Sequence, residues 1–177
     1  MSEKFIDYKK LFEETVGVEF PEIIDEATVI SNNITQEMSH LLKYEYAKRQ
    51  NSSWLNTIID SYNEVQKSIS KRTPKQLAKD MDVINAKLDS AYKTAVNDAY
   101  KYKDIVNVKD IPITRPEEFS IENLTDKEFL LRKIGNNYIP NAYSSEETKN
   151  YINSQKFKET FGMDFYDMKE KGYINNE

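Results

Sequence analysis

The chain has 177 residues, of which 38% are hydrophobic and 31% charged, and its net charge is −5. Only four glycines and five prolines interrupt it, so regular elements must be long and turns few, which excludes an all-β fold. The absence of cysteine excludes disulfides, thiolate metal sites and cysteine nucleophiles, and the acidic balance argues against a general nucleic-acid coat.

Two helices are expected at the start of the chain. Residues 3–16 carry apolar side chains at helical spacing, and Gly17 follows where a left-handed helix cap would lie. A longer amphipathic pattern then runs over about 21–50. Asn32 and Asn33 lie in the middle of this pattern and mark a place where the helix can kink or break.

The next two helices have clear start signals. Asn51, Ser52 and Ser53 supply a turn and a cap for a helix over 54–70 with a broad apolar face. Residues 73–76, Thr-Pro-Lys-Gln, form a capping box with proline at the first helical position. They begin a helix over 74–102 whose apolar residues recur in steps of four and three. Long helices joined by such short turns predict an all-α, up-down-up antiparallel bundle.

The pattern changes after residue 104. Residues 105–116 read as an extended connector, because each proline disfavours helix at the residue before it. Short capped helices follow, one ending at Gly135, one running from Ser144 to Phe161, and a last turn near residue 168. We therefore divide the chain into a long-helix body, 1–104, and a region of connector and short helices, 105–177.

Catalytic and metal sites are not expected. Glu37 and His40 have the Glu-x-x-His spacing of di-iron helical bundles, but His40 is the only histidine in the chain and cannot complete such a site. The paired carboxylates lie at helix ends or in loops, where they are not desolvated for acid–base work. Four scattered glycines cannot form a phosphate-binding loop. The sequence thus predicts no catalytic residue, no cofactor, no metal and no enzymatic activity.

A basic run surrounds the turn between the helices over 54–70 and 74–102. Its members are Lys67, Lys71, Arg72, Lys75 and Lys79. One interpretation is contact with a polyanion or a charged partner. The other is self-complementarity, because residues 13–26 hold six acids and no base, and an up-down-up bundle places them at the same end. No aromatic residue interrupts the run as base stacking would require, so nucleic acid is the less favoured partner.

Four tyrosines suggest exposed aromatic surface. Tyr44 and Tyr46, like Tyr100 and Tyr102, are too closely spaced for all four to point into one helical seam. Exposed aromatic surface is typical of protein interfaces. These residues are therefore candidates for contact with a partner.

The preferred function is that of a non-enzymatic helical assembly or interaction protein. Its expected partner is a protein, either a different chain or a second copy of itself. We expect the apolar stripe of 74–102 to dock on partner helices and the opposite-charge ends to set their orientation. Lys, Ile, Asn and Tyr fill more than a third of the chain, as in AT-rich genes, which favours a structural or morphogenesis component of a phage or mobile element.

Two alternatives remain open. One is a small inhibitor or accessory protein that binds a host protein through 105–177, and the other is nucleic-acid binding through 67–79. No stretch approaches the roughly 18 apolar residues of a membrane span. We therefore expect no membrane partner and a location in the cytoplasm or in a virion.

Overall fold

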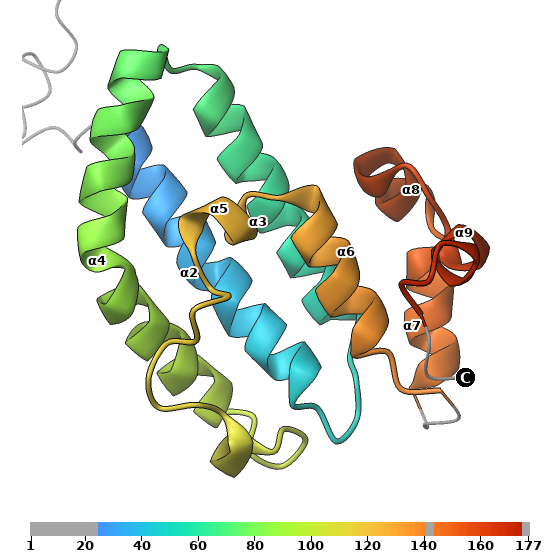
Figure 1. Ribbon diagram of the computed structural model, residues 1–177. Helices are drawn as coiled ribbons and strands as arrows, with labels where there is room; N and C mark the ends of the chain where they lie inside the picture. Colours follow the sequence, from blue (N-terminus) through green and yellow to red (C-terminus); the bar gives the residue numbers. More distant parts are fainter. Residues whose placement is uncertain (1–24, 141–143, 175–177) are drawn as a thin grey trace, which may run out of the picture.

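The computed structural model of the protein describes residues 25–140 and 144–174 and has an all-α fold (Figure 1). The elements are α2 (Glu26–Glu45), α3 (Ser52–Ser70), α4 (Pro74–Tyr100), the 3-10 helix η1 (Val108–Asp110), α5 (Ile121–Leu124), α6 (Lys127–Asn136), α7 (Ser145–Ile152), α8 (Gln155–Phe161) and α9 (Phe165–Glu170). The helix expected over 3–16, its Gly17 cap and residues 21–24 lie outside the described residues.

The three long helices form the bundle that the sequence predicts. α2 lies between α3 and α4 and makes the most extensive contacts with both (Figure 1). Ile34, Met38 and Leu41 of α2 are completely or almost completely buried. Burial of such a side chain contributes roughly 1.5–3 kcal/mol, so the apolar face of α2 is the main source of cohesion in the bundle.

The starts of α3 and α4 follow their predicted caps. The Asn51 side chain accepts a hydrogen bond from the Ser53 amide at 2.9 Å. The Thr73 hydroxyl accepts from the Gln76 amide at 3.2 Å, and the Gln76 side chain accepts from the Thr73 amide at 3.0 Å. These two hydrogen bonds complete the capping box. These boundaries are local, because each is set by hydrogen bonds between residues two or three apart.

The end of α2 differs from expectation. The helix continues through Asn32 and Asn33 without a break, but it ends at Glu45 and not near residue 50. Residues 46–48 leave the helix because they pair with the connector, where the Lys48 amide donates to the Ile105 carbonyl and the Asn107 amide to the Tyr46 carbonyl, at 2.8 and 2.7 Å. The connector was expected to be extended from residue 105, but only an isolated bridge between Ala47 and Val106 bears this out, and Val108–Asp110 form the 3-10 helix η1.

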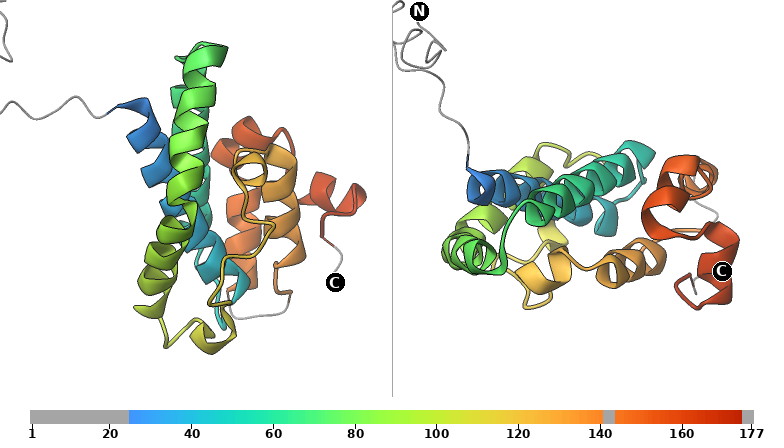
Figure 2. Two further views of the ribbon diagram at one scale, coloured as in Figure 1. Left: turned by 60° about the vertical axis from the view of Figure 1, so that its left-hand side comes forward. Right: turned by 90° about the horizontal axis from the view of Figure 1, so that it is seen from above.

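A second layer covers one face of the bundle. The connector lies over α2 and α4, where the Tyr92 hydroxyl donates to the Pro112 carbonyl, and α5 and α6 pack on α2 (Figure 1). The helices α7, α8 and α9 lie beside α3 and α6 (Figures 1 and 2). The Tyr44 hydroxyl donates to the Ile134 carbonyl at 2.9 Å and joins α2 to α6. One hydrophobic core extends from Ile30 to Ile174. The division of the chain at residue 104 stays a prediction.

Two boundaries in the short-helix region correct the sequence analysis. Gly135 does not end its helix, since α6 continues to Asn136. The segment 144–161 is not one helix but two, because the Ser154 side chain caps α8 by accepting from the Phe157 amide at 3.3 Å. The Asn153 side chain accepts from the Phe165 amide at 3.0 Å, so the break positions α9.

We expect Gly135→Ala to lower the free energy of unfolding by about 2 kcal/mol, the usual cost of overpacking. A Cβ atom at Gly135 would lie 2.3 Å from the Tyr173 carbonyl oxygen. Gly162 is the matched control, because a Cβ there meets nothing within 4 Å and its positive φ of 75° is the only obstacle. Urea unfolding should give a lower free energy of unfolding for Gly135→Ala than for Gly162→Ala. Equal values would contradict the close approach of Gly135 to the Tyr173 backbone.

Candidate functional site

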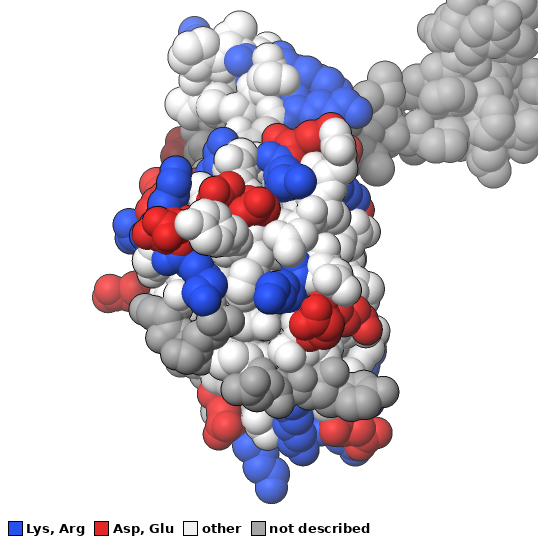
Figure 3. Space-filling view, turned by 90° about the vertical axis from the view of Figure 1, so that its right-hand side faces the viewer, with Lys and Arg blue, Asp and Glu red and all other residues white. Residues whose placement is uncertain are grey.

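The predicted basic run lies at the projecting end of the bundle. We call Lys67, Lys71, Arg72, Lys75 and Lys79 the basic tip. The hairpin of α3 and α4 carries it beyond the second layer (Figure 2). The uppermost part of the molecule accordingly shows basic and uncharged side chains, whereas both signs are interspersed lower down (Figure 3).

Part of the basic tip is neutralised within the chain. Arg72 forms a bidentate pair with Asp80, at 2.7 and 3.1 Å. The Lys71 ammonium lies 3.7 Å from a Glu26 carboxylate oxygen at the start of α2. The other three members, Lys67, Lys75 and Lys79, are exposed and make no ion pair with any residue that the structure describes. Within the described part of the chain, the basic tip therefore combines internal pairing with exposed positive charge.

The helix dipoles account for only some of these lysines. Lys67 lies in the last turn of α3, where a cation interacts favourably with the dipole. Lys75 lies in the first turn of α4, which contains no acid. A cation there is disfavoured by about 0.3–1 kcal/mol, so local helix stability does not explain it.

The four candidate tyrosines have different environments. Tyr44 is only 1% exposed, which corrects its assignment as an interface residue. Tyr46 is partly buried against the core, and this burial raises its pKa to about 12. Tyr100 and Tyr102 are 47% and 40% exposed. Only these last two provide exposed aromatic surface, at the end of the bundle opposite the basic tip.

Glu37 and His40 lie on the same helix but have different environments. Glu37 is completely buried, and neither carboxylate oxygen has a hydrogen-bond partner. Burial raises the pKa of Glu37 well above its ordinary value. The His40 ring nitrogen Nδ1 hydrogen-bonds to the Gln36 carbonyl at 2.9 Å. Among residues 25–140 and 144–174 there is no group of three or more potential His, Asp or Glu ligands.

A partly buried ion pair joins α2 to α4. The Lys43 side chain is 2% exposed, and its ammonium lies 2.8 Å from Asp98 Oδ2, which also accepts from the Ser39 hydroxyl at 2.5 Å. The ammonium also stands 4.2 Å from the centre of the Tyr102 ring. The sequence signals this cluster only weakly, because Asp98 is the residue that interrupts the apolar stripe of 74–102.

The cluster is built to hold helices together. Burial alone would raise the pKa of Asp98, but hydrogen bonds from Lys43 and Ser39 and the charge of Lys43 hold it below its ordinary value. Asp98 is therefore held in its charged form by contacts from α2. A cavity of about 280 Å³ opens beside the cluster between α2 and α4.

The apolar stripe of α4 is already covered. Ile84, Leu88 and Ala95 are buried in the core that α4 shares with α2. This corrects the expected mode of assembly, because the stripe is not available for docking on partner helices. Contact with a partner must use the outer surface.

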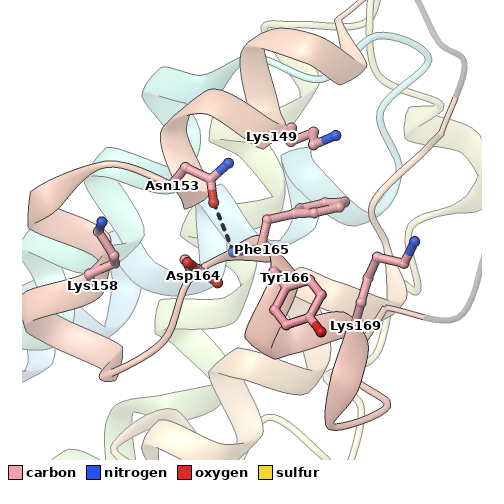
Figure 4. Close-up of a pocket in the computed structure, with 7 residues that line it drawn as sticks. All are labelled: Lys149, Asn153, Lys158, Asp164, Phe165, Tyr166 and Lys169. Carbon is pink, nitrogen blue, oxygen red and sulfur yellow. Dashed lines mark hydrogen bonds between the residues drawn. The ribbon is translucent and has the colours of Figure 1, made fainter.

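A pocket that the sequence analysis missed lies among the C-terminal helices (Figure 4). Its cavity measures about 420 Å³. It is lined by Lys149, Asn153, Lys158, Asp164, Phe165, Tyr166 and Lys169. The three lysines come from α7, α8 and α9, so no single helical pattern brings them together and no sequence signal was available.

Comparison with known proteins gives one match. Residues 4–130 match the model of a family described as domain of unknown function DUF29. No curated protein and no solved structure matches the chain. The matched range includes the basic tip and the Lys43–Asp98 pair and ends within α6, before the C-terminal pocket. In the described part of the chain, no helix is long and apolar enough to cross a membrane.

Proposed function

The chain belongs to the DUF29 family of unknown function, and from its own surfaces we propose that it is a non-enzymatic interaction protein that pairs with a second copy through the basic tip. The observation that carries this proposal is the exposed charge of Lys67, Lys75 and Lys79 at the projecting end, which no residue in the described ranges pairs with. Lys75 in particular lies in the first turn of α4, where the helix dipole disfavours a positive charge.

The acidic partner surface lies at the same end of the molecule. Asp25 and Glu26 begin α2, and Glu26 already contacts Lys71. When complementary charges share one end, two copies can meet tip to tip about a two-fold axis, with each basic tip facing the acidic start of the other α2. This contact must overcome the repulsion between two chains of net charge −5, so it should depend strongly on salt.

An acidic protein surface suits the basic tip better than nucleic acid does. No aromatic residue lies within 67–79 to stack on bases. Nucleic-acid binding, an inhibitory role toward a host protein and a phage or mobile-element origin stay predictions.

Reversal of three charges tests the pairing. We expect wild-type protein at low salt to sediment as a dimer that dissociates as salt is added. Lys67→Glu/Lys75→Glu/Lys79→Glu should weaken pairing about a hundredfold, because the two-fold dimer then contains six reversed charges and each changes the binding energy by about 0.5 kcal/mol. Lys48→Glu/Lys103→Glu/Lys109→Glu, an equal charge change in residues that line a cavity at the opposite end, should leave the dimer intact.

A wild-type chain that stays monomeric at high micromolar concentration, whatever the salt, would refute the pairing. A salt-sensitive gel shift with nucleic acid that the tip variant loses and the control variant keeps would assign the basic tip to nucleic acid instead.

A further inference from the structure

The cavity between α2 and α4 has fixed walls and the size of a site for a small ligand. Its volume is about 280 Å³, just below the range of roughly 300–1,000 Å³ that is typical of pockets for drug-sized ligands. Three lining residues come from α2, and the others come from α4 and its C-cap, Lys101. The Ser39 hydroxyl and the Lys43 ammonium of α2 both bond to Asp98 Oδ2 of α4. These bonds link the two walls, so the cavity is formed before any ligand arrives.

The lining of the cavity carries no net charge. Among the lining residues, all of which the structure describes, Asp98 is the only acid and Lys101 the only base. The Lys101 ammonium lies 3.7 Å from Asp98 Oδ1, and Lys43 compensates the same carboxylate from inside the bundle. A cation would therefore compete with two lysines for Asp98, and an anion would meet a carboxylate beside the single ammonium of the lining. This balance favours a neutral ligand.

The lining is also polar and offers hydrogen bonds of both kinds. Ala95 is its only apolar member, and no aromatic ring belongs to it, so an apolar ligand would bury little apolar surface there. The side-chain amides of Gln36 and Asn97 line the cavity and make no hydrogen bond with any residue that the structure describes. Each amide therefore presents both a donor and an acceptor.

Three hydroxyl groups of the lining can act only as acceptors toward a ligand. The Thr35 and Thr94 hydroxyls each donate to the carbonyl four residues earlier in their own helix, at 2.9 and 3.2 Å. The Ser39 hydroxyl donates to Asp98. Because a hydroxyl has one proton to donate, only lone pairs remain for the cavity. Asp98 Oδ1 accepts no hydrogen bond from the described residues. A ligand that matches these groups must bring several donors.

We propose that this cavity binds a small neutral polyol, either a cyclitol or a monosaccharide. Each hydroxyl of such a ligand can donate and accept. The ligand donates to Asp98 Oδ1 and the threonine oxygens, and it accepts from the amides of Gln36 and Asn97. The cavity lies toward the end of α4 that is opposite the basic tip, so the proposal does not depend on pairing of the chain.

Titration of the full chain with myo-inositol, followed by nuclear magnetic resonance, tests the proposal. We expect a millimolar dissociation constant, which is typical of a ligand with about twelve non-hydrogen atoms. The amide signals that shift should belong to residues 35–39 and 94–101. Cyclohexanol has the same ring with one hydroxyl and should bind at least about tenfold more weakly. Binding of inositol should not change with salt, because the ligand has no charge.

Two matched variants assign the contact. Thr94→Val keeps the shape of an exposed side chain and removes one acceptor from the cavity, so it should weaken inositol binding about fivefold. In Thr57 of α3 the hydroxyl likewise donates to the carbonyl four residues earlier, at 3.2 Å, but Thr57 does not line the cavity. Thr57→Val should therefore bind inositol like wild type.

Three results would overturn the proposal. The first is the absence of shifts at about 100 mM inositol, a concentration far above the expected dissociation constant. The second is binding of cyclohexanol or putrescine as tight as that of inositol, which would show an apolar or a cation site instead. The third is equal inositol binding by Thr94→Val and Thr57→Val.

Discussion

Replacement of Asp98 by alanine should lower the free energy of unfolding by about 3 kcal/mol, the lower end of the range for breaking a buried ion pair. The Lys43 side chain is 2% exposed, so its ammonium depends on Asp98 for most of its charge compensation. Asp98 itself is 34% exposed, so the converse change, Lys43→Met, leaves a carboxylate that solvent can still hydrate. We therefore expect the loss of Asp98 to cost more than the loss of Lys43.

Asp89 provides a matched control on the same helix. It pairs with Arg115 at 2.7 Å, but the Asp89 side chain is 84% exposed. Exposed pairs contribute only about 0–1 kcal/mol, so Asp89→Ala should change stability little. Urea unfolding of both variants, and of Lys43→Met/Asp98→Ala, tests the argument. The double variant should recover part of the lost stability, because no buried charge then remains unpaired. Equal losses for Asp89→Ala and Asp98→Ala would contradict the argument that burial makes the Lys43–Asp98 pair more important.

Replacement of Glu37 by methionine should raise the free energy of unfolding at pH 7 by about 2 kcal/mol, because it removes a buried polar group without hydrogen bonds. Burial raises the pKa of Glu37 in the folded protein. The folded chain therefore holds a proton that the unfolded chain releases above its ordinary pKa. Stability should fall as pH rises from that ordinary value toward the folded pKa, by at most about 1.4 kcal/mol per pH unit.

Unfolding between pH 5 and 8 separates the two effects. Glu37→Gln should flatten the pH dependence yet keep an unsatisfied polar group, and Glu37→Met should both flatten it and add stability. Tyr62 of α3 is the titratable group whose pKa Glu37 affects, and Asp126 at the start of α6 faces the same tyrosine. Both residues are unchanged in these variants. A Glu37→Met protein less stable than wild type would show that the carboxyl group makes a favourable contact.

The candidate sites were predictable to different degrees. The members of the basic tip are close in sequence, so their position at one end followed from two helices and a tight turn. The tyrosines were harder, because their spacing indicates that some must be exposed but not that Tyr44 is the buried one. Lys43 and Asp98 are 55 residues apart, and nothing within α2 or α4 alone shows that they meet.

The sequence by itself determined the helical class, the long hairpins and the starts of α3 and α4. These features depend on apolar periodicity and on hydrogen bonds between residues that are two or three positions apart, at Asn51 and Thr73. Tertiary structure decided where α2 ends, because the connector pairs with residues 46–48. It also decided which charges are buried and which lysines share the C-terminal pocket. Those outcomes depend on contacts between segments that are distant in the sequence. A local sequence pattern shows neither which segments meet nor how much free energy their contact contributes.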